Sequence, residues 1–285
     1  MALEKWAVLP GESRIIDIEL VRRLKVGLIG GQIDTLGHDE DSARIEVHSV
    51  TGKDLKISID GDVLEIDHPQ LGWDNFLDVF KSFGQNSAKA EISVLVPRTV
   101  ALTFGMVSAN ALISGLKTSA NLSTVNGELQ VEGVTGDLDL KSVSGEISVQ
   151  THTGAINAHT VSGDITASGN ISKFSSDGVS GDVFVDAHGH CDRISTNTVS
   201  GSLTARLSPD VGTRYVVNTV SGRLQLDNAV IRGTRGRGFQ STTEGDGNFY
   251  TDVVANSVSG NVTVIRRPDA APADKNDAFS TGGVA

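Results

Sequence analysis

The chain has 285 residues, a net charge of −11 and a single cysteine. Hydrophobic residues make up 38% of it, and with 32 glycines this is the composition of a folded protein, which excludes disorder over most of the chain. The acidic charge disfavours a protein that binds nucleic acid electrostatically, and one cysteine excludes an intramolecular disulfide. No stretch of 18 apolar residues occurs, so the sequence predicts no integral membrane segment.

The amino-terminal residues contain no apolar run of signal-peptide length, because Glu4 and Lys5 interrupt the only candidate. The sequence therefore predicts a cytoplasmic protein. The alternative is a protein that reaches the cell surface or the medium by a route that leaves no recognisable signal.

Residues 1–98 predict the amino-terminal β region of a solenoid, with a separate small β domain as the alternative. Apolar and polar residues alternate in four segments, as in half-buried strands. A hairpin turn is expected at residues 60–62, where the sequence is Asp-Gly-Asp. The four segments are residues 14–20, 44–48, 55–59 and 63–66.

Residues 73–83 interrupt this β pattern with an apolar face at helical spacing, formed by Trp73, Phe76, Leu77, Phe80 and Phe83. The sequence predicts one short amphipathic helix here. It would cap or cover the solenoid, or its aromatic residues Trp73, Phe76, Phe80 and Phe83 would form an interaction face for another molecule.

Residues 99–266 carry a repeat, which is the strongest signal in the chain. A tetrad recurs that consists of an apolar residue, then Ser, Thr or Asn, then Gly, then a mostly polar residue. Its glycines are spaced by 18, 18, 18, 20, 21 and 38 residues, and weaker copies lie halfway between the first strong ones. The last interval is expected to hold a degenerate copy or an inserted loop. The glycines are Gly127, Gly145, Gly163, Gly181, Gly201, Gly222 and Gly260.

Each tetrad is followed by alternating residues, as in Gly163-Asp164-Ile165-Thr166-Ala167, which predicts a strand after a turn. Units this short bury their apolar face only when they stack. The fold class predicted is all-β, a single-stranded parallel β-helix, or β-solenoid, with coils of about 18–21 residues. A β-propeller or antiparallel sandwich is the alternative.

Stacked coils would place equivalent side chains in ladders. The serines of the tetrads are expected to bond turn backbone, and asparagines four residues before the later glycines are expected to form an amide ladder. We interpret both ladders as structural. Their members are Ser144, Ser162, Ser180, Ser200, Ser221, Ser259, Asn197, Asn218 and Asn256.

Two sets of residues are candidate metal ligands. Glu128, Glu146, Asp164 and Asp182 follow the early glycines, but they lack the Gly-Gly-x-Gly-x-Asp core of calcium-binding repeats. The run from His188 to Asp192 contains Cys191 and two histidines, yet it lies where the repeat lengthens and reads more simply as a loop. We therefore predict no metal, no cofactor and no catalytic residues. Residues 267–285 read as a disordered tail.

The Thr-Val-Ser-Gly-Asp-Ile-Thr-Ala unit at residues 160–167 resembles the bacterial β-strand-repeat "putative adhesin" family of unknown function. Residues 23–31 and 50–57 also resemble the actinobacterial branch. The resemblance covers about residues 1–266. It implies a surface-exposed β-solenoid that binds other molecules, and it implies no catalytic residues.

The sequence thus predicts a non-enzymatic binding or scaffold protein that uses its stacked-coil surface or its rod ends. The partner would be a protein, a glycan or a second copy of the chain. Two alternatives stay open: a scaffold of bactofilin type that polymerises end to end, and a carbohydrate-active enzyme.

Overall fold

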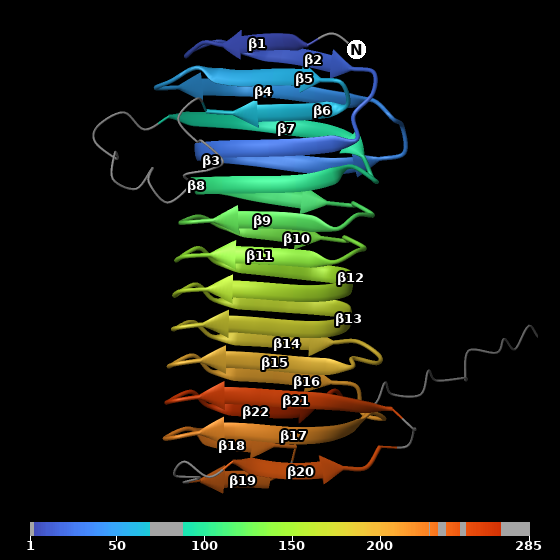
Figure 1. Ribbon diagram of the computed structural model, residues 1–285, viewed down its shortest axis with the longest axis vertical. Coiled ribbons are helices and arrows are strands. Elements are labelled where there is room, and N and C mark those ends of the chain that lie inside the picture. The colour runs from blue at the N-terminus through green and yellow to red at the C-terminus, as the bar shows by residue number, and fades with distance from the viewer. Residues whose placement is uncertain (1–2, 69–87, 228, 233–237, 246–248, 269–285) are drawn as a thin grey trace, which may run out of the picture.

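The computed structural model describes residues 3–68, 88–227, 229–232, 238–245 and 249–268. In these residues the chain forms 22 strands and no helix. The strands stack into an elongated, solenoid-like rod (Figure 1). The all-β fold predicted from the sequence is therefore confirmed.

Each coil of the rod contributes one strand to each of two facing sheets. In the repeat region β9 (Ala120–Thr124) pairs with β11 (Leu138–Ser142), and β10 (Leu129–Glu132) pairs with the first part of β12 (Ile147–Thr160). Both pairings are parallel, and each joins residues 18 positions apart, as in Ala120↔Leu138. The 18-residue coil inferred from the glycine spacing is thus the stacking period.

The chain reverses at two edges of the rod. The Val-Ser-Gly tetrads form the bends at one edge, here called the repeat edge, which lies to the left in Figure 1. The opposite edge carries the weaker tetrads and absorbs the extra residues of the longer coils. Ile165 and Phe174 are nine positions apart, whereas their partners Val183 and Ile194 are eleven apart. The coil therefore lengthens at the opposite edge while the repeat edge keeps its length.

The core lies between the two sheets and is built from inward-facing aliphatic columns. Ile147, Ile165, Val183 and Leu203 occupy equivalent positions in successive coils, and none is more than 7% exposed. Each lies two residues after a tetrad glycine, so the alternation after the glycine sets which side chains enter the core.

The amino-terminal end of the rod is not a regular continuation of the repeat. The long strand β3 (Arg23–His38) pairs in parallel with β6, β7 and β8, which follow it in the chain by about 25 residues or more. Beyond it the strands become antiparallel, and β1 and β2 each have one partner strand. The expected hairpin at residues 60–62 joins β5 and β6. The strands of this end are β1 (Glu4–Val8), β2 (Arg14–Ile18), β4 (Ala43–Thr51), β5 (Leu55–Asp60), β6 (Val63–Asp67), β7 (Lys89–Pro97) and β8 (Ala101–Ser114).

At the carboxyl-terminal end the coils are out of sequence order. The final coil, β21 (Tyr250–Ser257) with β22 (Val262–Arg266), lies between the coil of β15 and β16 and the coil of β17 and β18 (Figure 1). Two antiparallel strands, β19 and β20, then close the rod. In its described residues the 38-residue interval thus holds the coil strands β18 and β21 and the cap strands β19 and β20, rather than a degenerate copy of the tetrad. The last tetrad turns back between its two predecessors. The remaining strands are β13 (Ile165–Gly178), β14 (Val183–Ala187), β15 (Arg193–Thr198), β16 (Leu203–Leu207), β17 (Gly212–Thr219), β18 (Arg223–Leu226), β19 (Ala229–Arg232) and β20 (Phe239–Thr243).

Two predictions fall outside the described residues. The helix expected over residues 73–83 lies in the undescribed range 69–87, and the tail expected over residues 267–285 is described only as far as Pro268.

Candidate interaction surface at the repeat edge

A column of glycines makes the close stacking of the repeat edge possible. A Cβ atom added to Gly163 would lie 2.0 Å from the carbonyl oxygen of Gly145, and one added to Gly145 would lie 2.3 Å from that of Gly127. Real Cβ atoms do not approach so closely. The same clash recurs in every later coil, so the glycine is required by the distance between coils rather than by one turn type. Its members, in spatial order, are Gly127, Gly145, Gly163, Gly181, Gly201, Gly260 and Gly222.

The tetrad serines bond backbone, as the sequence suggested. Ser162 Oγ donates to the carbonyl oxygen of Val143 at 3.2 Å, and Ser144 Oγ donates to that of Val125 at 3.2 Å. In each case the acceptor is the tetrad valine of the neighbouring coil. Equivalent but longer bonds, of 3.4 to 3.5 Å, are made by Ser180, Ser200, Ser221 and Ser259.

A second hydroxyl in each bend was not singled out from the sequence. Thr160 Oγ1, three residues before Gly163, accepts the Gly163 N–H at 2.9 Å. Ser142 makes the same contact with Gly145 at 2.9 Å. The hydroxyl satisfies an N–H group that the bend would otherwise leave unpaired. The recurrence of Ser or Thr at this position is the sequence signal from which this contact could have been predicted.

The asparagine ladder forms in the spatial order of the coils. Asn256 Nδ2 donates to Asn197 Oδ1 at 2.8 Å, and Asn218 Nδ2 donates to Asn256 Oδ1 at 2.8 Å. Asn197 then donates to Asp177 Oδ1 at 2.7 Å. Asn256, the last in sequence, is therefore the middle rung. The three amides line a groove of about 350 Å³ together with Thr198, Thr219, Ser257, Val220 and Val258.

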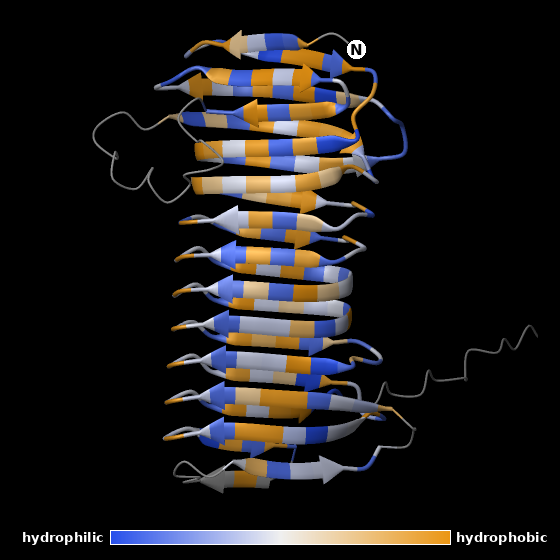
Figure 2. Ribbon diagram, in the orientation of Figure 1, coloured by the Kyte–Doolittle hydropathy of each residue, from blue (hydrophilic) through white to orange (hydrophobic). Residues whose placement is uncertain are grey.

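The tetrad valines form an apolar column along the same edge. In the later coils these side chains are 49 to 56% exposed, although they are large and aliphatic. Figure 2 shows apolar colour at successive bends along this edge. The exposed valines are, in spatial order, Val161, Val179, Val199, Val258 and Val220. Polar amides and apolar valines thus run side by side along the rod.

The carboxylates after the glycines are not simply solvated side chains. Asp164 Oδ1 accepts the backbone N–H of Asp182 at 2.8 Å, and Asp182 Oδ1 accepts that of Ser202 at 2.9 Å. Each carboxylate thereby satisfies a donor of the next coil. This contact stabilises Asp164 and Asp182 in their stacked positions.

The run from His188 to Asp192 does not assemble a ligand set. Cys191 is fully buried, and burial raises the pKa of its thiol to about 11, so it is protonated at neutral pH. His190 Nε2 lies 2.8 Å from its neighbour Asp192, while His188 Nε2 lies 3.5 Å from Asp186. Among the residues that the structure describes, no three His, Cys, Asp or Glu side chains gather closely enough to hold a metal ion.

Asp186 is the most enclosed carboxylate near this run. Burial raises its pKa, but ion pairs with Arg206 and Arg267 outweigh burial and hold the pKa at about 2. Arg206 lies in β16. Arg267 directly follows β22 of the final coil, here called the intercalated coil because it lies between two earlier coils. Asp186 therefore stays ionised at neutral pH, and its two ion pairs connect neighbouring coils.

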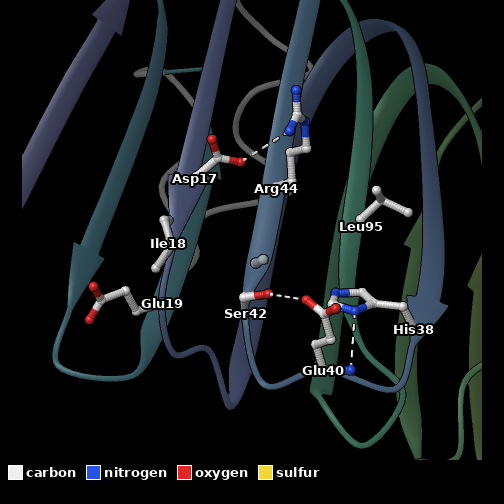
Figure 3. A pocket seen from close by; sticks show the side chains of 9 residues that line it. Asp17, Ile18, Glu19, His38, Glu40, Ser42, Arg44 and Leu95 are labelled. Carbon is white, nitrogen blue, oxygen red and sulfur yellow. Dashed lines mark hydrogen bonds and ion pairs between the residues drawn. The ribbon is translucent and has the colours of Figure 1, made fainter.

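A groove lies near the amino-terminal end of the rod (Figure 3). Its volume is about 600 Å³. Arg44 crosses it to Asp17 at 3.7 Å, and Ser42 donates to Glu40 at 3.2 Å. Within this groove, therefore, Arg44 is paired with Asp17 and Ser42 with Glu40.

The aromatic residues Trp73, Phe76, Phe80 and Phe83 lie outside the described residues. The structure therefore leaves the predicted interaction face as a prediction. No helix long and apolar enough to cross a membrane occurs in the described ranges.

Several solved structures resemble this chain. One, described as a "putative adhesin" from Bacteroides fragilis, has 13% identity and a TM-score of 0.49 over 90% of this chain and 98% of its own. A second "putative adhesin", from Parabacteroides distasonis, has 15% identity and a TM-score of 0.41 over 90% of this chain and 96% of its own. A "putative cell adhesion protein" from Clostridium sporogenes has 14% identity and a TM-score of 0.32 over 90% of this chain and 99% of its own.

No curated protein matches the chain. The actinobacterial branch suggested by residues 23–31 and 50–57 stays a prediction. A family model, in contrast, matches residues 32–265. This range spans β3 to β22 and includes all seven strong tetrads. On that match the protein belongs to the Toastrack DUF4097 family.

Proposed function

We propose that this protein is a non-enzymatic binding scaffold and that the repeat edge is its contact surface. The observation that supports this most directly is the juxtaposition of the asparagine ladder and the exposed valines around one groove. Hydrogen-bonding amides and apolar methyl groups at a constant spacing suit a long, regular partner, such as a glycan chain or an extended segment of protein.

The binding role is favoured over an enzymatic one by the state of two ionisable groups, Asp186 and Cys191. Asp186 is ionised but held in ion pairs with two arginines, and Cys191 is protonated and fully buried. A hydrolase or lyase would need carboxylates or bases held ready in a groove. The groove beside Arg44 instead has an ion pair between Arg44 and Asp17, and its carboxylates are open to solvent.

The binding proposal is tested by screening the full chain against panels of immobilised glycans and peptides. Asn256→Ala removes the middle rung of the ladder, and loss of one or two hydrogen bonds should weaken an edge ligand about tenfold. The matched control is Gln130→Ala, an exposed polar change on β10 in the other sheet. If every ligand found tolerates Asn256→Ala as well as it tolerates the control, the repeat edge is not the contact surface.

End-to-end polymerisation is the second candidate. The free edges are β1 and β2 at one end and β19 and β20 at the other. All four are antiparallel strands of unrelated sequence, so neither end continues the parallel repeat. Light scattering over a hundredfold range of concentration separates the candidates: a scaffold that does not polymerise keeps a constant mass, whereas a growing mass would favour the polymer.

We further propose a cytoplasmic location, with the cell surface as the alternative. Protease added to intact cells should leave the chain intact if it lies inside, while cytosolic markers verify that the cells have not lysed. Rapid loss of the chain would place it outside and make adhesion the working function.

A further inference from the structure

The exposed part of the valine column is a strip five coils long. Val161, Val179, Val199, Val258 and Val220 hold equivalent positions in successive coils and are 49 to 56% exposed. Neighbouring coils lie about 4.8 Å apart, so the strip is about 19 Å long. A row of half-exposed aliphatic side chains gains free energy when another surface covers it. A partner covers all five valines only if it follows the spacing of the coils.

The charge changes sign along one flank of this strip. Asp164 and Asp182 directly follow the tetrad glycines of its first two coils, whereas Arg223 follows the tetrad glycine of its last coil. Ser202 and Asn261 hold the same position in the two coils between them. In the spatial order of the coils, the flank therefore runs from acidic through neutral to basic.

The polar groups left over on this flank complement one another. Asp164 and Asp182 each use Oδ1 for a backbone N–H of the next coil, which leaves the second carboxylate oxygen for another donor. Asn261 Oδ1 accepts the N–H of Arg223 at 3.0 Å, so Nδ2 of Asn261 is the group left to donate. The Arg223 side chain is exposed and forms no ion pair with a carboxylate of the described residues.

The other flank carries the asparagine ladder, which is complementary to itself. Asn256 donates one N–H to Asn197 and accepts one hydrogen bond from Asn218. Because a side-chain amide has two N–H donors and two acceptor lone pairs, one of each stays available to an outside partner. A second copy of the ladder offers the same two groups at the same spacing.

We propose that two copies of this chain pair along the repeat edge in antiparallel orientation, about a twofold axis at Val199. The inference rests on the proposed function, because it names a second copy as the partner of that same edge. Such an axis places Val161 against Val220 of the other copy and Val179 against Val258. Every exposed valine then meets an exposed valine, and the two strips share one spacing, as an isologous interface requires.

The charges favour the antiparallel orientation. It brings Asp164 to Arg223 of the other copy, twice in the pair, and it brings Asp182 to the free Nδ2 of Asn261. A parallel pair would instead bring opposite flanks together coil by coil. Asp182 would then face Asp177, which lies on the asparagine flank of the same coil, and like charges in contact disfavour an interface.

The exposure of the valines favours the axis at Val199 over a shifted one. A shift by one coil would oppose Val220 to Val143. That side chain is partly buried and packs against the apolar cluster of Ile29, Ala88, Val107 and Val125. The contact is short, so it belongs to the small interfaces whose association is transient. The chain is therefore expected to be a single copy when dilute and a pair when concentrated.

The test is sedimentation equilibrium of the full chain up to millimolar concentration. The mass should rise to that of two copies and then stay level, whereas an end-to-end polymer would continue to grow. Val179→Lys should weaken the pairing at least about tenfold, because it places two charges inside the contact. The matched control is Ile15→Lys, a change of a 57% exposed side chain on β2 at the amino-terminal end of the rod. It should leave the pairing unchanged.

A charge reversal tests the orientation separately. Arg223→Asp should weaken the pairing about tenfold, because the new carboxylate faces Asp164 of the other copy. Adding Asp164→Arg to this variant should restore the pairing, since the opposite charges meet again. Asp164→Arg also removes the acceptor of the Asp182 N–H, so thermal melts of each variant verify that the rod stays folded.

Three results would overturn the inference. The first is the mass of a single copy at every concentration. The second is an equal loss of pairing in Ile15→Lys, which would place the contact at the rod end. The third is a folded double variant that does not regain the pairing. A glycan or peptide that binds the dilute chain and is lost in Asn256→Ala would still support the proposed function, so the two failures are distinguishable.

Discussion

Single residues at the repeat edge are constrained by the neighbouring coil more than by their own bend. Gly163 shows this most clearly, because an added Cβ would meet the Gly145 carbonyl oxygen at 2.0 Å. Gly61, in the hairpin between β5 and β6, has a positive φ of 63° but nothing within 4 Å of an added Cβ. Gly163 is required because there is no space for a Cβ atom, whereas Gly61 is required because its φ is positive.

Gly163→Ala should therefore destabilise the protein much more than Gly61→Ala does. Moving two stacked backbones apart should cost more than about 3 kcal/mol, whereas a left-handed alanine costs about 1–2 kcal/mol. Urea unfolding followed by circular dichroism measures both. Similar midpoints for the two variants would mean that the coils separate easily, contrary to the glycine-column argument.

The residues after the glycine test the register of the core. Ile165 is 1% exposed, and Ile165→Asp would place a charge between the sheets at a cost of several kcal/mol. Asp164→Asn should be nearly silent, because the amide oxygen still accepts the Asp182 N–H. Thermal melts of both variants check this, and equal tolerance would contradict the assigned register.

His152 introduces a pH dependence into the core. It is fully buried at the position that Leu116 and Val134 fill in the two preceding coils. Burial lowers its pKa, so the unfolded chain takes up the proton more readily, and stability should fall as pH drops below about 6.5. His152→Val should reduce that loss, and the remainder belongs to His68, whose pKa burial lowers to about 4. The midpoints of urea unfolding at pH 7.5 and pH 5.0 measure the loss of stability in the parent and in the variant. An equal loss in the two proteins would exclude His152 as a cause.

At the scale of elements, the regular coils follow from the sequence and the terminal coils do not. The glycine steps of 18 residues give the pairing of β10 with β12 directly. The 38-residue step before Gly260 carries no sign that β21 returns between β15 and β17. Repeat spacing encodes the length of a coil but not its place in the stack, and long-range pairing depends on contacts that no local pattern records.

The intercalated coil is fastened by Arg266. Its Nε atom bonds Asp227 Oδ1 at 2.8 Å, and its Nη2 atom bonds Thr213 Oγ1 at 2.7 Å. Asp227 also accepts the Tyr215 hydroxyl at 2.8 Å. Burial and this carboxylate together raise the pKa of Tyr215 to about 12, so the hydroxyl remains a donor.

Arg266→Met should loosen the carboxyl-terminal coils selectively. The partly buried Asp227 would lose its counter-ion, at a cost of about 3 kcal/mol. Hydrogen exchange should accelerate in residues 212–227 and 250–266 and stay unchanged in residues 120–178. The exposed Arg193 provides the control substitution, Arg193→Met. Uniform acceleration along the whole rod would show that the coils unfold as one unit.

At the scale of the whole molecule, the candidate surface was foreseen in part. The serine and asparagine ladders are readable from equivalent positions in the repeat, and both sets lie at the edge where stacking predicts them. The exposure of Val161 and the role of Thr160 were not foreseen. An apolar residue in a repeat is read as core, and only the geometry of the bend reveals that it faces solvent.

The two edges of the rod differ in how much space they leave for inserted residues. At the opposite edge Gly136, Gly154 and Gly169 are stacked as closely as the tetrad glycines. Gly189, where the coil has grown by two residues, has open space around it. At the repeat edge no bend between Gly145 and Gly260 has room for even one added methyl group. New loops, tags or grafted epitopes therefore belong in the lengthened bend around Gly189. At the repeat edge, in contrast, the side chains between the glycines can be exchanged while the distance between successive coils stays fixed.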